Sequence, residues 1–317
     1  MIRIAILDDF QDAARFTADW SRLAGRAEPT FFTDNLTGDA LVERLLPFEI
    51  AVAIRERTPF PRALLDRLPN LRMIATTGMR NLGIDVAHCR SRGIPVSGTD
   101  GAGAPTAELA FALILALSRN IVAEDRSLRA GTWETRRLGG VVRGRTLGLV
   151  GLGKLGAEVA AMGRAFGMTI LAWSPNLTQA RAGTTAKAVD KDRLFAESDY
   201  ISIHMVLSDR SRGLVGDTDL RRMKPTACLV NTSRAALVDQ AALLAALHEH
   251  RIAGAALDVF EHEPVPPGDP VLAAPNTILT PHLGYATREN YATYFPQTVE
   301  NIEAFLNGQP RRLLPHD

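Results

Sequence analysis

The stretch Gly144-Arg-Thr-Leu-Gly-Leu-Val-Gly-Leu-Gly-Lys-Leu-Gly156 decides the fold of this chain. It begins with a short apolar run, residues 146–150, of the kind that forms a buried strand. The glycine pattern G-x-G-x-x-G follows at once, and beyond it apolar side chains recur at helical spacing as far as Phe166. A strand, a glycine turn and a helix in this order predict a dinucleotide-binding turn, in which a pyrophosphate lies against the N–H groups that begin the helix.

Each glycine of the turn has its own expected task. Gly151 allows the tight turn after the strand, Gly153 lets the backbone approach the pyrophosphate closely, and Gly156 lets the helix pack against the strand. Lys154 and Leu155 lie between these glycines, so we place them in the cofactor-binding turn as well.

Composition narrows the class of protein. The chain has 317 residues, which predicts two domains, and its net charge of +1 gives no indication of a nucleic-acid or other polyanion surface. Cys89 and Cys228 are far apart and form neither a metal-binding spacing nor a disulfide framework, which fits a reducing compartment. The N-terminus lacks the pattern of a secretory signal, and the most apolar helical run, residues 110–117, is too short to span a bilayer. We therefore expect a cytoplasmic protein without a membrane or nucleic-acid partner.

The chain before residue 98 alternates between two kinds of segment. Strand-like runs are found at 3–7, 30–33, 50–54, 72–76 and 95–97, with helical stretches at 12–23, 39–46, 61–68 and 84–92. This alternation predicts a parallel sheet with helices on both faces. A glycine-rich break at 98–105 marks a domain boundary, and we predict one long helix after it, at 106–130, lying between domains or subunits because it is apolar on nearly every face.

A second alternating set begins with the glycine stretch. Its strands are predicted at 146–150, 169–173, 200–204, 227–231, 254–259 and 277–280. A last helix, at 288–306, is expected to pack back on the first domain. The prediction is an α/β protein of two Rossmann-like or flavodoxin-like domains with parallel sheets. The dinucleotide-binding domain, 99–287, is inserted into a substrate-binding domain made of 1–98 and 288–317.

Reactive side chains follow three strands of the second set. They lie in the segments Asn231-Thr-Ser-Arg234, Asp258-Val-Phe-Glu-His-Glu-Pro264 and Thr280-Pro-His-Leu-Gly284. Ligands of an open α/β sheet bind at the carboxyl ends of its strands. We therefore expect an arginine, a carboxylate and a histidine on one rim, beside the cofactor turn.

Taken together, these motifs resemble the D-isomer-specific 2-hydroxyacid dehydrogenases over nearly the whole chain. The resemblance rests on Gly151-Leu-Gly-Lys-Leu-Gly156, Asn231-Thr-Ser-Arg-Ala235 with Val238-Asp239, Ala256-Leu-Asp-Val-Phe-Glu261, Glu263-Pro264 and Thr280-Pro-His-Leu-Gly284. It implies reversible reduction of a 2-keto acid to a D-2-hydroxy acid with a nicotinamide coenzyme, without a metal. It also implies a homodimer, which the apolar long helix favours.

The resemblance assigns roles that suit the chemistry of the side chains. Arg234 would bind the substrate carboxylate and carbonyl oxygen with its planar fork of donors. His282 would give the proton to the carbonyl oxygen and take it back in the reverse reaction. Glu263 would hydrogen-bond His282 and favour its protonated form.

The remaining site residues would contact the coenzyme or the substrate. The resemblance implies that Asp258 meets the nicotinamide carboxamide, and it places His204 and Thr232 on the cofactor side; Val206 stands where the family usually has a proline after the histidine. In the first domain the loop Thr76-Thr-Gly-Met-Arg-Asn81 resembles the family's substrate loop, so Gly78, Met79 and Arg80 are expected to bind substrate, with backbone N–H groups reaching a carboxylate.

Coenzyme choice stays open at this point. A Rossmann site for NAD usually has an acid about 20 residues past the glycines, bound to the ribose hydroxyls. Here the second strand ends in Ser174-Pro-Asn176, which supplies no carboxylate, and Arg181 and Lys187 are the nearest cations that could meet a 2′-phosphate. With Ser174 in place of the usual acid, both NAD and NADP remain possible coenzymes, and NAD is favoured.

Two other functions remain open from the sequence. Relatives of this fold oxidise formate or phosphite, although a formate enzyme of this family has glutamine where Glu263 stands. Other relatives sense NAD as co-repressors that bind protein motifs, and the set of Arg234, Glu263 and His282 does not exclude such a role. The sequence does not name the acid.

Overall fold

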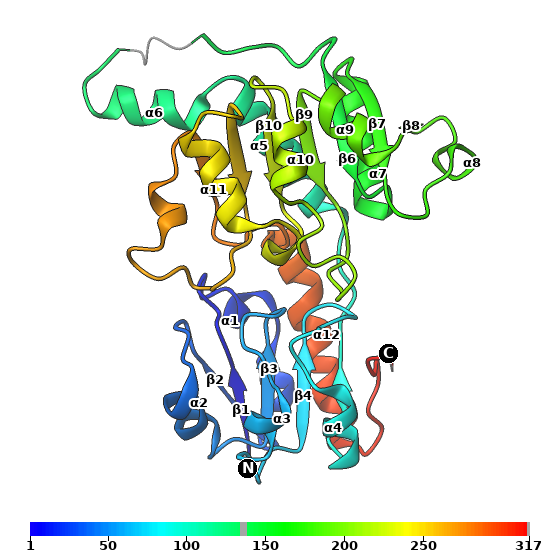
Figure 1. The fold of residues 1–317 in the computed structure, drawn as a ribbon. Coiled ribbons are helices and arrows are strands. Elements are labelled where there is room, and N and C mark those ends of the chain that lie inside the picture. The colour runs from blue at the N-terminus through cyan, green and yellow to red at the C-terminus, as the bar shows by residue number, and fades with distance from the viewer. Residues whose placement is uncertain (134–137, 316–317) are drawn as a thin grey trace. The chain divides into compact units, whose positions relative to one another are not determined.

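The computed structural model describes residues 1–133 and 138–315. The chain divides into two compact units, Met1–Gly103 with Ala286–Asp317, and Ala104–Tyr285 (Figure 1). We call these the outer unit and the inserted unit. The divisions lie close to the sequence-based boundaries at 98/99 and 287/288.

The outer unit is built on a five-stranded sheet in the order β2-β1-β3-β4-β5, and every neighbouring pair is parallel. Its strands are β1 Ile2–Ile6, β2 Ala27–Phe31, β3 Ile50–Ala53, β4 Met73–Thr76 and β5 Val96–Ser97. This is the flavodoxin-like order. All residues of β3 and β4 are buried, which explains why these strands read in the sequence as continuous apolar runs.

Helices of the outer unit surround this sheet. They are α1 Ala14–Thr17, α2 Gly38–Leu45, α3 Arg62–Leu65, α4 Val86–Ser91 and α12 Arg288–Leu306, with a 3-10 turn η1 at Trp20–Leu23. As predicted, α12 packs on this unit, against β4 and α1. The single helix predicted at 12–23 is wrong. Ala18 is extended, and the side chain of Asp19 accepts the N–H of Ser21, which starts a separate turn.

The inserted unit holds a seven-stranded sheet in the order β12-β11-β10-β9-β6-β7-β8, again with every neighbouring pair parallel. The strands are β6 Thr146–Val150, β7 Thr169–Trp173, β8 Lys187–Ala188, β9 Tyr200–Ile203, β10 Cys228–Asn231, β11 Gly254–Leu257 and β12 Thr277–Leu279. Strand order reverses between β6 and β9, and ligands of doubly wound sheets bind at such a reversal. The six predicted strands are confirmed, and the two-residue β8 was not predicted.

Helices cover the inserted sheet. They are α5 Pro105–Ser118, α6 Ile121–Arg129, α7 Lys154–Ala165, α8 Gln179–Ala182, α9 Lys191–Glu197, α10 Asp217–Arg222 and α11 Gln240–His248, with 3-10 turns η2 at Ala235–Leu237 and η3 at Pro270–Ala273. The continuous helix predicted at 106–130 is wrong, because Asn120 takes a left-handed conformation (φ 53°) and α6 turns away from α5 by 61°.

Helix α5 is a core helix of the inserted unit. It contacts α7, β10 and β11, and its apolar residues join the buried cluster under the sheet. One side of α5 therefore packs within its own unit, and contact of the other side with a second domain or subunit stays a prediction. Within the described residues no single helix is long and apolar enough to cross a bilayer, and α5 and α6 meet that test only when joined across their bend.

Candidate active site

The glycine turn after β6 has the geometry that the sequence predicts. Gly151 has φ +102°, and a Cβ added there would lie 2.4 Å from the carbonyl oxygen of His204. A Cβ on Gly156 would lie 2.3 Å from the carbonyl oxygen of Gly151, so the first turn of α7 packs directly on the end of β6. A Cβ on Gly153 would meet nothing within 4 Å, and no side chain caps α7. An open cradle therefore stands at the N-terminus of α7, where a pyrophosphate fits.

Two buried polar atoms beside this turn have no hydrogen-bond partner among the described residues. They are Nδ1 of His204 and Oγ1 of Thr232, which follow the neighbouring strands β9 and β10. The other ring nitrogen of His204, Nε2, lies 2.9 Å from Oγ of Ser202. Buried polar groups nearly always have partners, so the two orphaned atoms indicate a ligand with polar groups at this rim. The cradle and these atoms fit a dinucleotide.

Burial lowers the pKa of His204 to about 4. The charged form of the ring is disfavoured because burial removes its hydration. His204 is therefore neutral at physiological pH. It can form hydrogen bonds, but it does not gain or lose a proton there.

Arg234 is fixed by the turn that follows β10. The side chain of Asn231 donates from Nδ2 to the carbonyl oxygen of Arg234 at 3.0 Å and accepts the N–H of Ser233 at 3.0 Å. Ser233 in turn donates through Oγ to the carbonyl oxygen of Ile203 at 2.6 Å, which ties the turn to β9. The Asn-Thr-Ser run therefore explains how the arginine backbone is held at the rim, while its Nη1 donates to the Ser233 carbonyl at 2.7 Å.

His282 and Glu263 form the pair that the resemblance implies. Nδ1 of His282 lies 2.6 Å from Oε2 of Glu263, and the other carboxylate oxygen accepts the N–H of Phe260 at 2.8 Å. Burial raises the pKa of Glu263, but the hydrogen bond and charge of His282, the Phe260 N–H and the charge of Arg234 outweigh it, so this pKa lies below its ordinary value. Glu263 is therefore an ionised partner that fixes one nitrogen of the imidazole and leaves Nε2 for chemistry.

Asp258 organises the turn that carries His282. Its Oδ1 accepts the hydroxyl of Thr280 at 2.6 Å and the N–H of Leu283 at 2.7 Å, and its Oδ2 accepts the N–H of Gly284 at 2.8 Å. Burial raises the pKa of Asp258 above its ordinary value, and these three hydrogen bonds partly oppose that rise. The contact with a nicotinamide carboxamide stays a prediction; the contacts within the unit hold the backbone of the histidine turn.

The sequence did not predict two residues that contact the histidine turn. Thr106, in the first turn of α5, donates through its hydroxyl to the Gly284 carbonyl at 2.7 Å. The ring of Tyr285 stands edge-to-face with the imidazole of His282, with centroids 5.5 Å apart and planes at 71°. Nothing in the sequence points to Thr106, because the contact joins segments far apart in the chain. Tyr285 could have been noted as the aromatic residue directly after the histidine motif.

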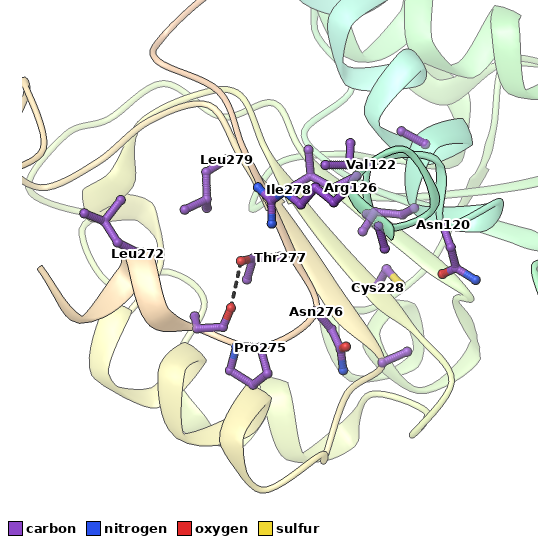
Figure 2. A pocket seen from close by; sticks show the side chains of 15 residues that line it. Asn120, Val122, Arg126, Cys228, Leu272, Pro275, Asn276, Thr277, Ile278 and Leu279 are labelled. Atoms are coloured by element: carbon purple, nitrogen blue, oxygen red, sulfur yellow. Dashed lines mark hydrogen bonds between the residues drawn. The ribbon is translucent and has the colours of Figure 1, made fainter. Parts of the chain in front are cut away.

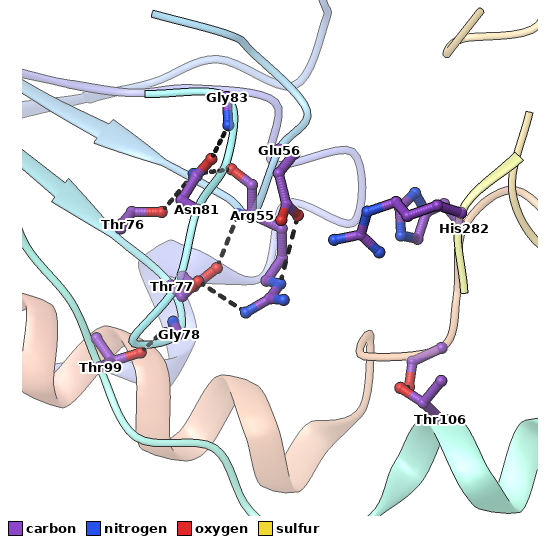
Figure 3. A network of polar contacts seen from close by, with 12 residues as sticks. Arg55, Glu56, Thr76, Thr77, Gly78, Asn81, Gly83, Thr99, Thr106 and His282 are labelled. Atoms are coloured by element: carbon purple, nitrogen blue, oxygen red, sulfur yellow. Dashed lines mark hydrogen bonds and ion pairs between the residues drawn. The ribbon is translucent and has the colours of Figure 1, made fainter. Parts of the chain in front are cut away.

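The loop after β4 lies in the outer unit, within a polar network that Figure 3 shows. Gly78 has φ +88°, a conformation that other residues rarely adopt, so the backbone here favours glycine, and a Cβ would also displace the end of the Arg55 side chain. The Gly78 N–H donates to the hydroxyl of Thr99 at 2.8 Å, and the Gly83 N–H at the end of the loop donates to Oδ1 of Asn81 at 2.9 Å. Met79 and Arg80 also line a pocket of about 390 Å³ beside α4. Arg55, two residues after the end of β3, was not predicted, because no motif in the sequence marks the end of this strand.

Ser174, which the sequence predicts to face the ribose of the coenzyme, comes directly after β7. Its carbonyl oxygen accepts the N–H of Leu177 at 3.1 Å, which closes a turn over residues 174–177 that contains no acid. Arg181 reaches back to this turn and donates from Nη1 to the Asn176 carbonyl at 3.3 Å. Lys187 lies on the edge strand β8.

A larger pocket of the inserted unit, of about 410 Å³, lies away from these residues (Figure 2). It is lined by the end of α5, by α6 and by β12 with the segment before it. Cys228 reaches it, and burial raises the pKa of that thiol to about 12, so it is unreactive. None of the predicted site residues lines this pocket. In the described part of the chain, no group of three or more His, Cys, Asp or Glu side chains is arranged to hold a metal.

Comparison with known proteins identifies the family. Residues 111–284 match the NAD-binding domain of D-isomer-specific 2-hydroxyacid dehydrogenases. A glyoxylate reductase of Korarchaeum cryptofilum is 40% identical over 276 residues, which cover 85% of this chain and 83% of the relative. A hydroxypyruvate reductase of Thermotoga maritima is 35% identical over 88% of this chain and 92% of its own length.

A solved structure agrees over the whole fold. A phosphoglycerate oxidoreductase of Vibrio cholerae superposes with a TM-score of 0.92 at 40% identity, covering 97% of this chain and all of the other. The open glycine turn, with two unpartnered polar atoms beside it, and the two parallel sheets are consistent with the family of these relatives. The chain belongs to the D-isomer-specific 2-hydroxyacid dehydrogenase family and is an oxidoreductase with a nicotinamide-cofactor domain.

Proposed function

We propose that this protein interconverts a small 2-keto acid and the corresponding D-2-hydroxy acid. The observation that carries the proposal is the 2.6 Å contact between His282 and the ionised Glu263, on the sheet rim that also holds the dinucleotide cradle. A nicotinamide coenzyme supplies or accepts the hydride when it is bound. In the direction of reduction, the carbonyl carbon gains the hydride and His282 gives the proton to the carbonyl oxygen from Nε2.

The other residues bind and orient. Arg234 would hold the substrate carboxylate and carbonyl oxygen, since a guanidinium is always charged and donates in a planar fork. In the outer unit, the loop with Gly78, Met79 and Arg80 would bind substrate through its backbone N–H groups, as the resemblance implies. On the coenzyme side, Gly151, Gly153, Lys154, Leu155 and Gly156 would bind the pyrophosphate.

Three further residues would complete the coenzyme site. His204 and Thr232 would satisfy their orphaned atoms with polar groups of the coenzyme. Asp258 has a lone pair left for the nicotinamide carboxamide, since a carboxylate has about four acceptor sites and three are used here.

A substrate screen tests the proposed reaction. The relatives named above suggest glyoxylate and hydroxypyruvate as first candidates, with pyruvate as a third, each assayed with NADH and with NADPH. We expect sustained oxidation of the reduced coenzyme by at least one of these acids. Coenzyme binding without turnover by any 2-keto acid would instead favour a sensor or co-repressor role.

We propose NAD as the preferred coenzyme. A substitution at Ser174 tests whether this residue faces the adenosine ribose, where NAD and NADP differ. Ser174→Asp adds an acceptor for the ribose hydroxyls and repels a 2′-phosphate. We expect the ratio of kcat/KM for NADH to that for NADPH to rise by about 10-fold or more, as for one charged hydrogen bond.

The control for this experiment is Thr169→Asp, which adds the same charge at the opposite end of β7. It should leave the coenzyme ratio unchanged. An unchanged ratio in Ser174→Asp as well would remove Ser174 from the ribose site.

We also propose that the protein is a homodimer in the cytoplasm. Exposed apolar side chains support the dimer, since Ile121, Leu128, Trp133 and Val141 are each more than half exposed in and after α6. We expect a dimer in analytical ultracentrifugation, and Leu128→Glu should shift it toward monomer. Phe16→Glu, at an exposed position of the outer unit, is the control, and it should leave the dimer intact.

A monomeric wild type would contradict the proposal of a homodimer. Two buried free cysteines fit the reducing cytoplasm.

A further inference from the structure

The hydrogen bond to Glu263 fixes only one point of the His282 ring. Rotation about χ2 moves Nδ1 and Nε2 together, so this hydrogen bond limits the rotation only to the range of angles that a hydrogen bond tolerates. Proton transfer requires Nε2 to lie within hydrogen-bonding reach of the reacting oxygen. A second contact on the ring narrows the range of planes that remains.

Tyr285 makes such a contact. Its ring stands edge-to-face with the imidazole at 5.5 Å and 71°, and the residue is only 7% exposed. This is the arrangement that aromatic pairs prefer, because the positive edge of one ring meets the negative face of the other. A packed aromatic ring of low exposure cannot swing aside, so it restricts the plane of the imidazole.

The backbone on both sides of this contact is also held. Gly284, next to Tyr285, donates its N–H to Asp258 and accepts the hydroxyl of Thr106. A Cβ on Gly284 would lie 3.1 Å from both of these side chains, so the turn is closely packed where Tyr285 begins. His282 and Tyr285 therefore project from one fixed turn.

We propose that Tyr285 is a positioning residue for His282, and that its ring sets the plane in which Nε2 of the imidazole presents its proton. The proposal rests on the acid–base role of His282 in the proposed reaction. It assigns the task to the aromatic ring of Tyr285, so phenylalanine should perform it and an aliphatic residue should not.

Two substitutions separate the ring from the rest of the side chain. Tyr285→Phe keeps the ring and should leave kcat within about 3-fold of wild type. Tyr285→Leu removes the ring and should lower kcat by roughly 10- to 100-fold, as small misplacements of a reacting group do. The Kd of the reduced coenzyme, measured by fluorescence, should change by less than about 3-fold in either variant, because the contact orients a proton donor and binds no coenzyme.

A spectroscopic measurement tests the placement without using activity. In protein labelled with ¹³C at histidine Cε1, the His282 signal is assigned as the one missing in His282→Ala. We expect Tyr285→Leu to move this signal through the lost ring current and Tyr285→Phe to leave it near its wild-type position. This measurement works even if no 2-keto acid is reduced, so failure of the proposed function and failure of the positioning role can be told apart.

Phe166→Leu is the matched control. Phe166 packs on Phe111 in the same unit, with ring centroids 4.9 Å apart, so the variant loses a comparable ring contact away from His282. It should leave kcat and the His282 signal unchanged. Three results would overturn the proposal: an unmoved signal in Tyr285→Leu, a moved signal with unchanged kcat, or equal losses in Tyr285→Phe and Tyr285→Leu.

Discussion

Replacement of His282 by alanine is expected to lower kcat for keto-acid reduction by roughly 10²- to 10⁴-fold, the range that general acid–base groups contribute. His282 carries the proton in the proposed reaction, and its Nδ1 is already engaged by Glu263, so Nε2 is the nitrogen that reacts. Steady-state kinetics with the best 2-keto acid measure the loss. The control is His248→Ala, because His248 lies on α11 and its Nδ1 is 2.8 Å from the carbonyl oxygen of Leu244 in the same helix. Near-wild-type turnover in His282→Ala would mean that another group carries the proton.

The pH dependence of reduction follows from the same pair. Glu263 has a pKa below its ordinary value, so it stays negative over the usual assay range and favours the protonated imidazole that reduction needs. Glu263→Gln keeps a hydrogen-bonding group and removes the charge. The negative charge 2.6 Å from the imidazole is then missing, so the decline of reduction at high pH should move to lower pH while coenzyme affinity stays nearly unchanged. A decline at the wild-type pH would remove Glu263 as the effective partner.

Arg234→Lys is expected to lower kcat/KM for the 2-keto acid by roughly 10²-fold or more, comparable to the loss of one oxyanion donor. Lysine keeps the positive charge but loses the planar pair of donors that matches a carboxylate. Kinetics with NADH held at saturation measure the change. Arg222→Lys is the control, because Arg222 makes an exposed ion pair with Asp192 at 3.0 Å and should tolerate the exchange. Wild-type kcat/KM in Arg234→Lys would remove this residue from the substrate site.

Local patterns predicted the sheets because buried parallel strands must be apolar throughout. They failed where a short polar feature overrides the periodicity. Asn120 in a left-handed conformation breaks the predicted long helix, and the cap of Asp19 divides another. Strand β8 has only two residues, one of them lysine, so no apolar run announces it.

The candidate site shows the same division. Arg234, Glu263 and His282 could be identified because each follows a strand of one parallel sheet, and strand ends share an edge. The resemblance implied the contact between Glu263 and His282, but the contacts that hold the backbone of the histidine turn were not visible in the sequence. The three hydrogen bonds of Asp258 and the hydroxyl of Thr106 join segments brought together only by folding, and no spacing rule connects residue 106 with residue 284.

The hydrogen bond between Thr106 and Gly284 joins the two places where the chain enters and leaves the inserted unit. The unit runs from Ala104 to Tyr285, and the 2.7 Å contact between Thr106 and Gly284 holds its first and last turns together. A domain whose ends meet can be placed within a loop of another domain without stretching it, and such domains tolerate transplantation and circular permutation. The Thr106–Gly284 hydrogen bond thus closes residues 104–285 at their two ends, which helps to explain how one polypeptide can leave the outer unit after its five strands and afterwards return to add α12.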